Sequence, residues 1–378
     1  MLIRGLTWNY FRLKTLTKKI NLLAMIFAGF TVFSFHHAAM AEPVKIGISL
    51  PLSGNSSPLG KQFVAGARLA MRLLPDANNI ELVISDDGCD EKLAELAIDD
   101  IKNAGAALVT GFLCNEPVFA AASMMRDNSI PILVAGARSN RIIKDRKRFS
   151  WDIWQMAPRD ADASQSAFDI LVKRWKSVPY AIVDDGTVFG RTQADEFRVL
   201  MEEAGVKPLF VDNFRPSQST QAGLIRRLGK SGVEAIFLAA GDDDVALIGR
   251  NMIEFGTGLE IATGEGISLL PYIDDNKGVP VGLLAIMPAP PEDVPAIRFL
   301  NKKIEAANLE PEPYLLLGYA TIQLVLDYLG AEEKSFSGKI FNTILGPVEF
   351  DKNGKNISKQ YFLYRWNGAN FIRVETDN

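Results

Sequence analysis

His36 and His37 are the only two histidines in this chain, so any imidazole chemistry would depend on them. Both lie within residues 1–41, where basic side chains precede an apolar run at 20–35 and the sequence then reads Ala39-Met40-Ala41. This order is typical of a secretory signal peptide, and we expect cleavage after Ala41. The alternative is a membrane anchor, which the run disfavours because it is shorter than the roughly 20 residues needed to span a bilayer. A cleaved chain would contain no histidine, which excludes histidine-dependent triads and histidine-ligated zinc.

Cys89 and Cys114 are the only two thiols. An even cysteine count in an exported protein favours a disulfide over a metal site or a catalytic thiol, although two free buried thiols remain the alternative. A bridge over this loop would stabilise the fold by about 3.5 kcal/mol on the chain-entropy account. The chain contains neither a Gly-x-Ser-x-Gly elbow nor a Walker loop. We therefore expect no enzymatic activity, no cofactor and no metal.

The overall charge is −4, and loss of the five basic leader residues would leave 36 basic and 45 acidic residues, or about −9. Such an acidic chain is a poor partner for nucleic acid. No second long apolar run follows Ala41, so we expect a soluble protein outside the cytoplasm. The remaining 337 residues suit two domains better than one hydrophobic core.

Short β-rich runs alternate with amphipathic helical stretches, and this alternation starts again after a bridging segment at 151–156. Strands that alternate with helices predict parallel sheets covered on both faces, and the restart predicts two such units. The expected strands are 44–50, 80–86, 107–110 and 131–135, then 180–184, 208–213, 235–239 and 260–263.

The last third of the chain departs from this alternation. A strand at 282–287 runs into Pro288-Ala289-Pro290-Pro291. This proline-rich stretch can continue neither a sheet nor a helix, and we interpret the stretch as a crossing between the two units. Helices are expected at 294–307 and 314–329. A turn at 350–354 then precedes alternating segments that predict a closing hairpin, 361–366 and 371–374.

Several short motifs occupy strand ends and helix starts in a fixed order along the chain. They are Ser53-Gly54, Gly66-Ala67-Arg68, Asp86-Asp87-Gly88-Cys89-Asp90, Gly111-Phe112-Leu113-Cys114, Ala135-Gly136-Ala137, Phe189-Gly190, Gly264-Glu265-Gly266 and Asp351-Lys352-Asn353-Gly354. In order and spacing these motifs resemble the periplasmic leucine/isoleucine/valine-binding proteins, the solute-capturing components of ATP-driven importers. The resemblance extends over essentially the whole chain after residue 41.

The resemblance implies an α/β type I periplasmic-binding-protein fold, with two doubly wound parallel-sheet lobes joined by three crossings and a ligand cleft between them. It assigns residues 42–157 and 288–350 to lobe 1, and residues 158–287 and 351–378 to lobe 2. It also implies a bridge between Cys89 and Cys114 within lobe 1.

In lobe 1, the resemblance places Asn115, Gly136 and Arg138 at the groups that hold the ligand's carboxylate and ammonium. Asn115 and Arg138 replace small hydroxyl residues. An arginine there would pair with a carboxylate, fill the space meant for the backbone of an amino-acid ligand, or point to solvent. Leu59 and Tyr314 correspond to positions that wall the cleft, with packing in the core as the alternative.

In lobe 2, the resemblance places Glu265 where a carboxylate neutralises the ligand's ammonium, with a solvated loop glutamate as the alternative. A charge in a closing cleft needs a partner, which a cationic group of the ligand would supply. Phe189 would stack on the ligand or pack within its lobe. Asp242 begins a run of three aspartates, for which the alternative is a helix start that favours the macrodipole.

The sequence therefore predicts a periplasmic solute-binding protein of an ABC importer, acting as a monomer. Its expected partners are a membrane permease and a small zwitterionic or amide ligand, either a branched-chain amino acid or a more polar molecule. The alternative is a periplasmic sensor of the same fold that reports its ligand to a regulator.

Overall fold

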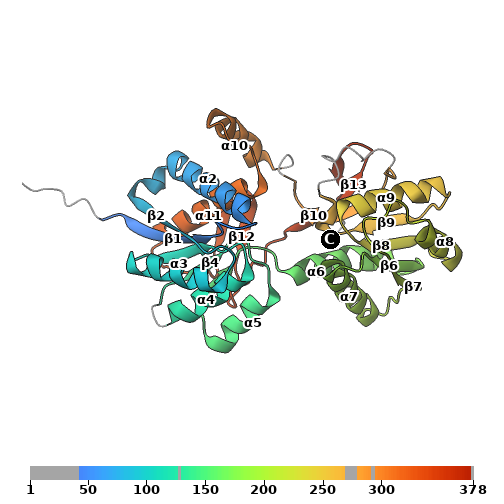
Figure 1. Cartoon of the computed structure of the whole chain (residues 1–378), viewed down its shortest axis with the longest axis horizontal. Coiled ribbons are helices and arrows are strands. Elements are labelled where there is room, and N and C mark those ends of the chain that lie inside the picture. The colour runs from blue at the N-terminus through green and yellow to red at the C-terminus, as the bar shows by residue number, and fades with distance from the viewer. Residues whose placement is uncertain (1–41, 127–128, 269–278, 291–293, 376–378) are drawn as a thin grey trace, which may run out of the picture. The chain divides into compact units, whose positions relative to one another are not determined.

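The computed structural model describes residues 42–126, 129–268, 279–290 and 294–375. The predicted leader, 1–41, lies outside these residues. The described chain forms two α/β lobes, each built on a mainly parallel sheet (Figure 1). The predicted fold class is confirmed. No helix among the described residues combines the length and apolarity that crossing a bilayer requires.

The first sheet contains, within the described residues, five parallel strands in the order β2-β1-β3-β4-β5. Its strands are β1 (Val44–Leu50), β2 (Ile80–Asp86), β3 (Leu108–Gly111), β4 (Ile132–Val134) and β5 (Ile153–Gln155). The helices that follow them are α2 (Ser57–Leu73), α3 (Glu91–Asn103), α4 (Asn115–Met125) and α5 (Asn140–Phe149). Two later helices, α10 (Pro295–Ala306) and α11 (Pro313–Gly330), pack against the same core.

Successive residues of the central strands face opposite layers of helices. Leu108 packs with α2 and α11, whereas its neighbour Val109 packs with α3 and α4. Figure 1 shows these helix pairs on the two faces of the sheet. Because both faces are covered, the central strands β3 and β4 are buried along their whole length rather than at alternate positions, as is general in parallel sheets.

Two glycines allow α2 and α11 to approach each other closely. A Cβ added at Gly66 would lie 1.8 Å from the carbonyl oxygen of Leu315, and one at Gly318 would lie 2.2 Å from that of Phe63. Backbone therefore packs directly on backbone where the two helices cross. Because these contacts leave no room for a side chain, Gly66 and Gly318 position the helix layer above the first sheet.

The second sheet has seven strands among the described residues, in the order β14-β13-β10-β9-β8-β6-β7. The parallel strands are β6 (Tyr180–Asp184), β7 (Phe210–Asn213), β8 (Ala235–Ala239), β9 (Glu260–Thr263) and β10 (Leu284–Pro288). The antiparallel strands β13 (Tyr361–Trp366) and β14 (Phe371–Arg373) extend this sheet at the β10 edge.

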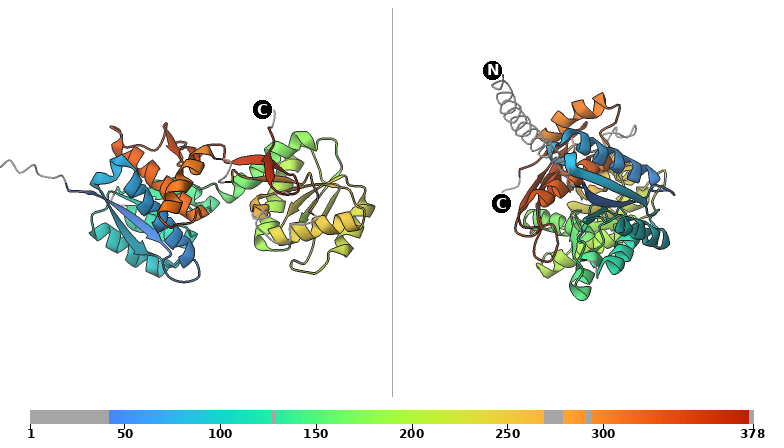
Figure 2. Two further views of the ribbon diagram at one scale, coloured as in Figure 1. Left: turned by 90° about the horizontal axis from the view of Figure 1, so that it is seen from above. Right: turned by 90° about the vertical axis from the view of Figure 1, so that its left-hand side faces the viewer.

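Helices also cover both faces of the second sheet (Figure 2). Ile182 and Phe237 pack with α6 (Asp160–Arg174) and α7 (Val188–Glu203). Val183 and Leu238 face the opposite layer, α8 (Ala222–Ser231) and α9 (Asp242–Glu254).

The structure adds two features that the sequence pattern does not predict. The segment expected to bridge the units, 151–156, contains the short strand β5 at the edge of the first sheet. A separate two-stranded ribbon of β11 (Ile340–Thr343) and β12 (Gly346–Glu349) packs beside α11. The strand predicted at 282–287 is confirmed as β10, which pairs with β9 and β13 of the second sheet. The crossing predicted at Pro288–Pro291 lies partly outside the described residues. The closing hairpin is confirmed as β13 and β14.

The chain passes between the two lobes after β5, at residues 156–159, again between β10 and α10, and a third time at residues 351–360. The first and third of these passages are joined by hydrogen bonds in or next to them. The amide of Gln155 donates to the Gly354 carbonyl at 2.8 Å, and the buried Asn356 side chain donates to the Met156 carbonyl at 2.8 Å. The exact lobe boundaries, 42–157 with 288–350 and 158–287 with 351–378, stay a prediction.

Candidate ligand-binding site

Two charged side chains lie just beyond the carboxyl ends of strands from different sheets. Arg138 is on the loop between β4 and α5, and Glu265 begins the 3₁₀ turn Glu265–Ile267 that follows β9. Loops at the carboxyl ends of parallel strands are where open α/β sheets bind small ligands. Both residues therefore lie at the ends of their sheets where a ligand site is expected.

Arg138 and Glu265 form a direct ion pair. Nη2 of Arg138 is 2.7 Å from Oε1 of Glu265, and the two side chains are 30% and 15% exposed. A charge-assisted contact of this length between largely covered groups is a strong one. The structure brings these two predicted residues into direct contact, with the opposite charges paired.

Tyr361, the first residue of β13, links both members of the pair. Its hydroxyl accepts a hydrogen bond from Arg138 Nη2 at 2.8 Å and donates one to Glu265 Oε2 at 3.2 Å. Asp160, the first residue of α6, lies 3.4 Å from Arg138 Nε. We call Arg138, Glu265, Tyr361 and Asp160 the charge cluster.

The environment of the charge cluster sets the protonation of Arg138 and Tyr361. Burial disfavours the guanidinium charge, but Tyr361 and Glu265 together raise the pKa of Arg138 above its usual value. Burial also raises the pKa of Tyr361, and the neighbouring Glu265 adds to this shift. At neutral pH Arg138 is therefore a cation and Tyr361 a neutral hydroxyl, as the direction of their hydrogen bonds requires.

Asn115 and Gly136 support the loop that carries Arg138. Asn115 is the first residue of α4, and its Oδ1 accepts from the amide of Ser139 at 3.2 Å. Gly136 lies against Leu113, whose Cδ2 would be 2.7 Å from an added Cβ. Gln155 Nε2 also donates to the carbonyl of Ala137, at 3.0 Å. The loop is thus tied down on both sides of Arg138.

Phe189 and Asp242 lie in the first turns of two helices of the second lobe. Phe189 is 50% exposed in α7, so it does not fill the core of its lobe. Asp242 begins α9, and Gly241 is the N-cap residue. Asp242 and the next two aspartates therefore lie in the first helical turn, where negative charge is favoured by the helix dipole.

Leu59 and Tyr314 lie near the starts of α2 and α11 respectively, and both are partly buried. Partial burial is compatible with either a cleft wall or the margin of the core. The roles predicted for these two residues, and for Phe189 and Asp242, stay predictions.

Sequence reasoning missed Tyr361 and Asp160. Tyr361 is part of an alternating apolar strand, where a tyrosine normally indicates core packing, and its ring is indeed 2% exposed. Asp160 opens a helix, where an acidic residue needs no further explanation. Neither position carries a local signal for a contact with Arg138, since that contact depends on how distant segments meet.

The disulfide between Cys89 and Cys114 is present, with the two Cα atoms 5.4 Å apart. It joins the loop before α3 to the residue before α4. The adjacent Asp86 carboxylate accepts hydrogen bonds from the amides of Leu52, Ser53 and Gly88. Together these contacts hold the loops at the carboxyl ends of β1, β2 and β3.

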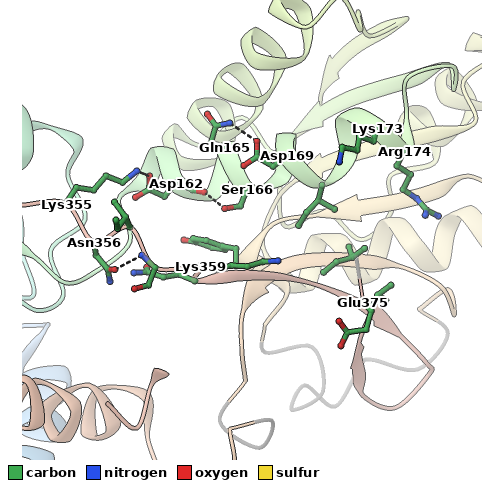
Figure 3. Close-up of a pocket in the computed structure, with 17 residues that line it drawn as sticks. Asp162, Gln165, Ser166, Asp169, Lys173, Arg174, Lys355, Asn356, Lys359 and Glu375 are labelled. Atoms are coloured by element: carbon green, nitrogen blue, oxygen red, sulfur yellow. Dashed lines mark hydrogen bonds and ion pairs between the residues drawn. The ribbon is translucent and has the colours of Figure 1, made fainter. Parts of the chain in front are cut away.

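A groove of about 860 Å³ runs between α6 and the third crossing segment, Lys355 to Tyr361 (Figure 3). Its walls carry both signs of charge, and Lys355 pairs with Asp162 at 2.9 Å. The groove shares only Tyr361 with the charge cluster. It therefore lies beside the crossing segments and is separate from the loops that carry Arg138 and Glu265.

Comparisons with known proteins agree on one family. Residues 43–370 match a family described as "Periplasmic binding protein". "Leu/Ile/Val-binding protein homolog 1" of Brucella melitensis is 24% identical over 367 residues, covering 93% of this chain and 96% of that protein.

Two solved structures show the same fold. A leucine-binding protein from Thermotoga maritima matches with a TM-score of 0.62 at 20% identity, covering 88% of this chain and 98% of that one. A solute-binding protein of an ABC transporter from Rhodopseudomonas palustris, in complex with 3,4-dihydroxybenzoic acid, matches with a TM-score of 0.63 at 17% identity. That match covers 86% of this chain and 93% of the other.

Proposed function

The chain belongs to the periplasmic binding protein family, and we propose that it captures a small zwitterionic, amino-acid-like ligand for an ABC importer. The family and its solved relatives support a solute-binding protein of the ABC-transporter type, which binds without covalent chemistry. The ligand and the importer are the finer parts of the proposal.

One observation carries the choice of ligand: the opposite charges of Arg138 and Glu265 meet at 2.7 Å from the loops of two different sheets. A carboxylate and an ammonium on one small molecule match this pair, since the carboxylate would face Arg138 and the ammonium would face Glu265. Each ligand charge would then have a partner of opposite sign inside a covered site.

The fold alone does not select this ligand, because a leucine-binding protein and a protein holding 3,4-dihydroxybenzoic acid share it. Glu265 supports an ammonium-bearing ligand over an aromatic acid. A benzoate-type ligand carries a negative charge and no cation, so it would offer Glu265 no partner.

We assign supporting contacts to the other predicted residues. Asn115 and the backbone of Gly136 would complete the hydrogen bonds to the ligand's charged groups, and Phe189 would stack on its side chain. Asp242 would add a polar contact from α9. Leu59 and Tyr314 would wall the cleft from lobe 1.

Closure of the two lobes would couple binding to transport. Arg138 and Glu265 come from different sheets, so a ligand between them makes its full set of contacts only when both loops reach it. The closed form would then be offered to a membrane permease. The hydrogen-bonded passages at residues 156–159 and 351–360 are segments about which the lobes would move.

Delivery to the periplasm completes the proposal. The basic start, the apolar run and Ala39-Met40-Ala41 support removal of a leader after Ala41. Sequencing the N-terminus of the protein from a periplasmic extract should find Glu42 first. A chain that begins at Met1 in that extract would contradict processing.

A thermal-shift screen against the amino acids and small amides tests the proposed function. A ligand present at a hundred times its dissociation constant adds about 2.7 kcal/mol to stability, which raises the melting temperature measurably. We expect one or a few related zwitterions to do this. A screen in which aromatic acids raise the melting temperature and no amino acid does would refute the assigned ligand class.

A further inference from the structure

We propose that Glu265 determines which class of ligand binds, because its ion pair with Arg138 masks this arginine from simple carboxylates. This inference rests on the proposed function and adds a mechanism of selection to it. In the ion pair each side chain supplies the charge that a ligand would offer to the other. Only a molecule with both charges can replace this pair and leave Arg138 and Glu265 each with a partner of opposite charge.

Two of the three guanidinium nitrogens of Arg138 face acidic groups or the Tyr361 hydroxyl. Nη2 is shared between Glu265 Oε1 at 2.7 Å and the Tyr361 hydroxyl at 2.8 Å, while Nε faces Asp160 Oδ1 at 3.4 Å. Two carboxylates therefore surround one guanidinium. The formal charge of the cluster is −1, since Tyr361 is neutral at ordinary pH.

This arrangement of charges around Arg138 distinguishes three kinds of small molecule. A monocarboxylate must displace Glu265 from Arg138, and it leaves the Glu265 carboxylate without a cation in a covered position. A simple amine must displace Arg138 from Glu265, and it leaves the Arg138 guanidinium without that carboxylate partner. A zwitterion exchanges one internal ion pair for two external ones, so neither protein charge is left uncompensated.

Tyr361 makes this exchange possible without rebuilding the site. Its hydroxyl contacts both charges, at 2.8 and 3.2 Å, and its ring is packed in the core of the second lobe. When a ligand separates the pair, the hydroxyl can keep a hydrogen bond to either partner. It thus acts as a positioning residue for both charged groups.

The test uses acetate and methylammonium as probes, because both are small enough to reach the cluster whatever side chain the natural ligand carries. Binding is followed by NMR titration of the wild-type protein, Glu265→Gln and Arg138→Gln. Glutamine keeps the length and hydrogen-bonding capacity of Glu265 but removes its charge. Glu202→Gln is the matched control, because Glu202 pairs with Arg198 at 3.3 Å at the opposite end of α7 from Phe189.

We expect Glu265→Gln to bind acetate at least about tenfold more tightly than the wild-type protein, because Arg138 is unmasked. Arg138→Gln should gain a similar factor for methylammonium, because Glu265 and Asp160 then lack their cation. Glu202→Gln should change neither affinity. Melting curves show whether each variant is folded. If one of Glu265→Gln and Arg138→Gln does not fold, the titration of the other variant with its own probe tests the masking role.

The outcomes separate this inference from the proposed function. If neither variant gains its probe, or if the wild-type protein already binds acetate as tightly as Glu265→Gln, the masking role is overturned. The proposed function is judged separately by the amino-acid screen on the wild-type protein. Gains in both variants with no amino acid bound would support masking and overturn the assigned ligand.

Discussion

Arg138 Nη2 lies 2.7 Å from Glu265 Oε1, although one residue follows β4 in the first sheet and the other follows β9 in the second. Both side chains sit on turns that their own sheets hold in place. Their contact therefore depends on both loops, and under the proposed function ligand binding would depend on both lobes. The first prediction concerns the hydroxyl that bridges this pair.

Replacing Tyr361 by phenylalanine should lower ligand affinity by about five- to thirtyfold, because two hydrogen bonds to charged groups are lost while the ring remains packed. Calorimetry with the ligand found in the screen measures this change. Tyr180→Phe is the matched control: Tyr180 is equally buried and its hydroxyl donates to the Val206 carbonyl in the same lobe. It should cost stability and leave affinity unchanged. Equal affinities in Tyr361→Phe and the wild-type protein would exclude a positioning role.

The crossing of α2 and α11 should not tolerate a side chain at Gly66. An alanine Cβ would lie 1.8 Å from the Leu315 carbonyl oxygen, so the two helices must separate. We expect Gly66→Ala to lower the free energy of unfolding by about 1–3 kcal/mol or more, as overpacking does. Gly330→Ala is the control, because nothing lies within 4 Å of its added Cβ at the end of α11. Urea denaturation that finds the two variants equally stable would contradict the close approach.

The disulfide should account for a measurable share of the stability of lobe 1. The double variant Cys89→Ser/Cys114→Ser should lose up to about 3.5 kcal/mol of unfolding free energy, the chain-entropy value for a loop of this length. Using both substitutions avoids a single unpaired thiol. Thiol labelling of the denatured, unreduced wild-type protein should find none. Two labelled cysteines per chain would show that the bridge is not formed.

Asp162 should stabilise the protein in a pH-dependent way. Burial opposes its charge, but hydrogen bonds from Arg159 and Lys355 lower the pKa of Asp162 below its ordinary value of 3.8. A lowered folded-state pKa gives stability that is present above the ordinary pKa and is lost as the pH falls through the folded value.

Asp162→Asn should therefore lower the unfolding free energy by about 1–3 kcal/mol at pH 7. This deficit should begin to shrink below about pH 4. Asp195→Asn is the control, since Asp195 is 70% exposed in its pair with Arg198 and should matter little at any pH. Urea denaturation at pH 7 and at several lower values measures both. A deficit that stays constant down to pH 3 would mean that the charge of Asp162 is not its source.

The sequence predicts elements well where a strand is apolar throughout and flanked by turn residues. The strand Ala235–Ala239 has the predicted bounds, because all five residues are buried between two helix layers. Strand β5 was missed because it has only three residues, and the Trp and Met around it suggested a linker. The β11–β12 ribbon was missed because its residues alternate between buried and exposed over only four positions in each strand.

The candidate site was predictable one loop at a time. The motif resemblance located Arg138 and Glu265 at strand ends, and the carboxyl ends of parallel strands are where α/β sheets generally bind ligands. Their mutual contact was not predictable, because it depends on how two sheets meet. Tyr361 was missed for the same reason, since its partners come from both sheets and its own strand reads as core.

Calorimetric titration of the wild-type protein, Glu265→Gln and Arg138→Ala with the amino acid selected by the screen tests the central claim most directly. Removing one partner of a charged contact in a desolvated site costs roughly 2–5 kcal/mol, so each substitution should weaken binding at least about thirtyfold. The melting temperature of each ligand-free variant should show that it is folded. Unaltered affinity in both variants would contradict recognition of a zwitterion by Arg138 and Glu265, and the assigned ligand class would be wrong.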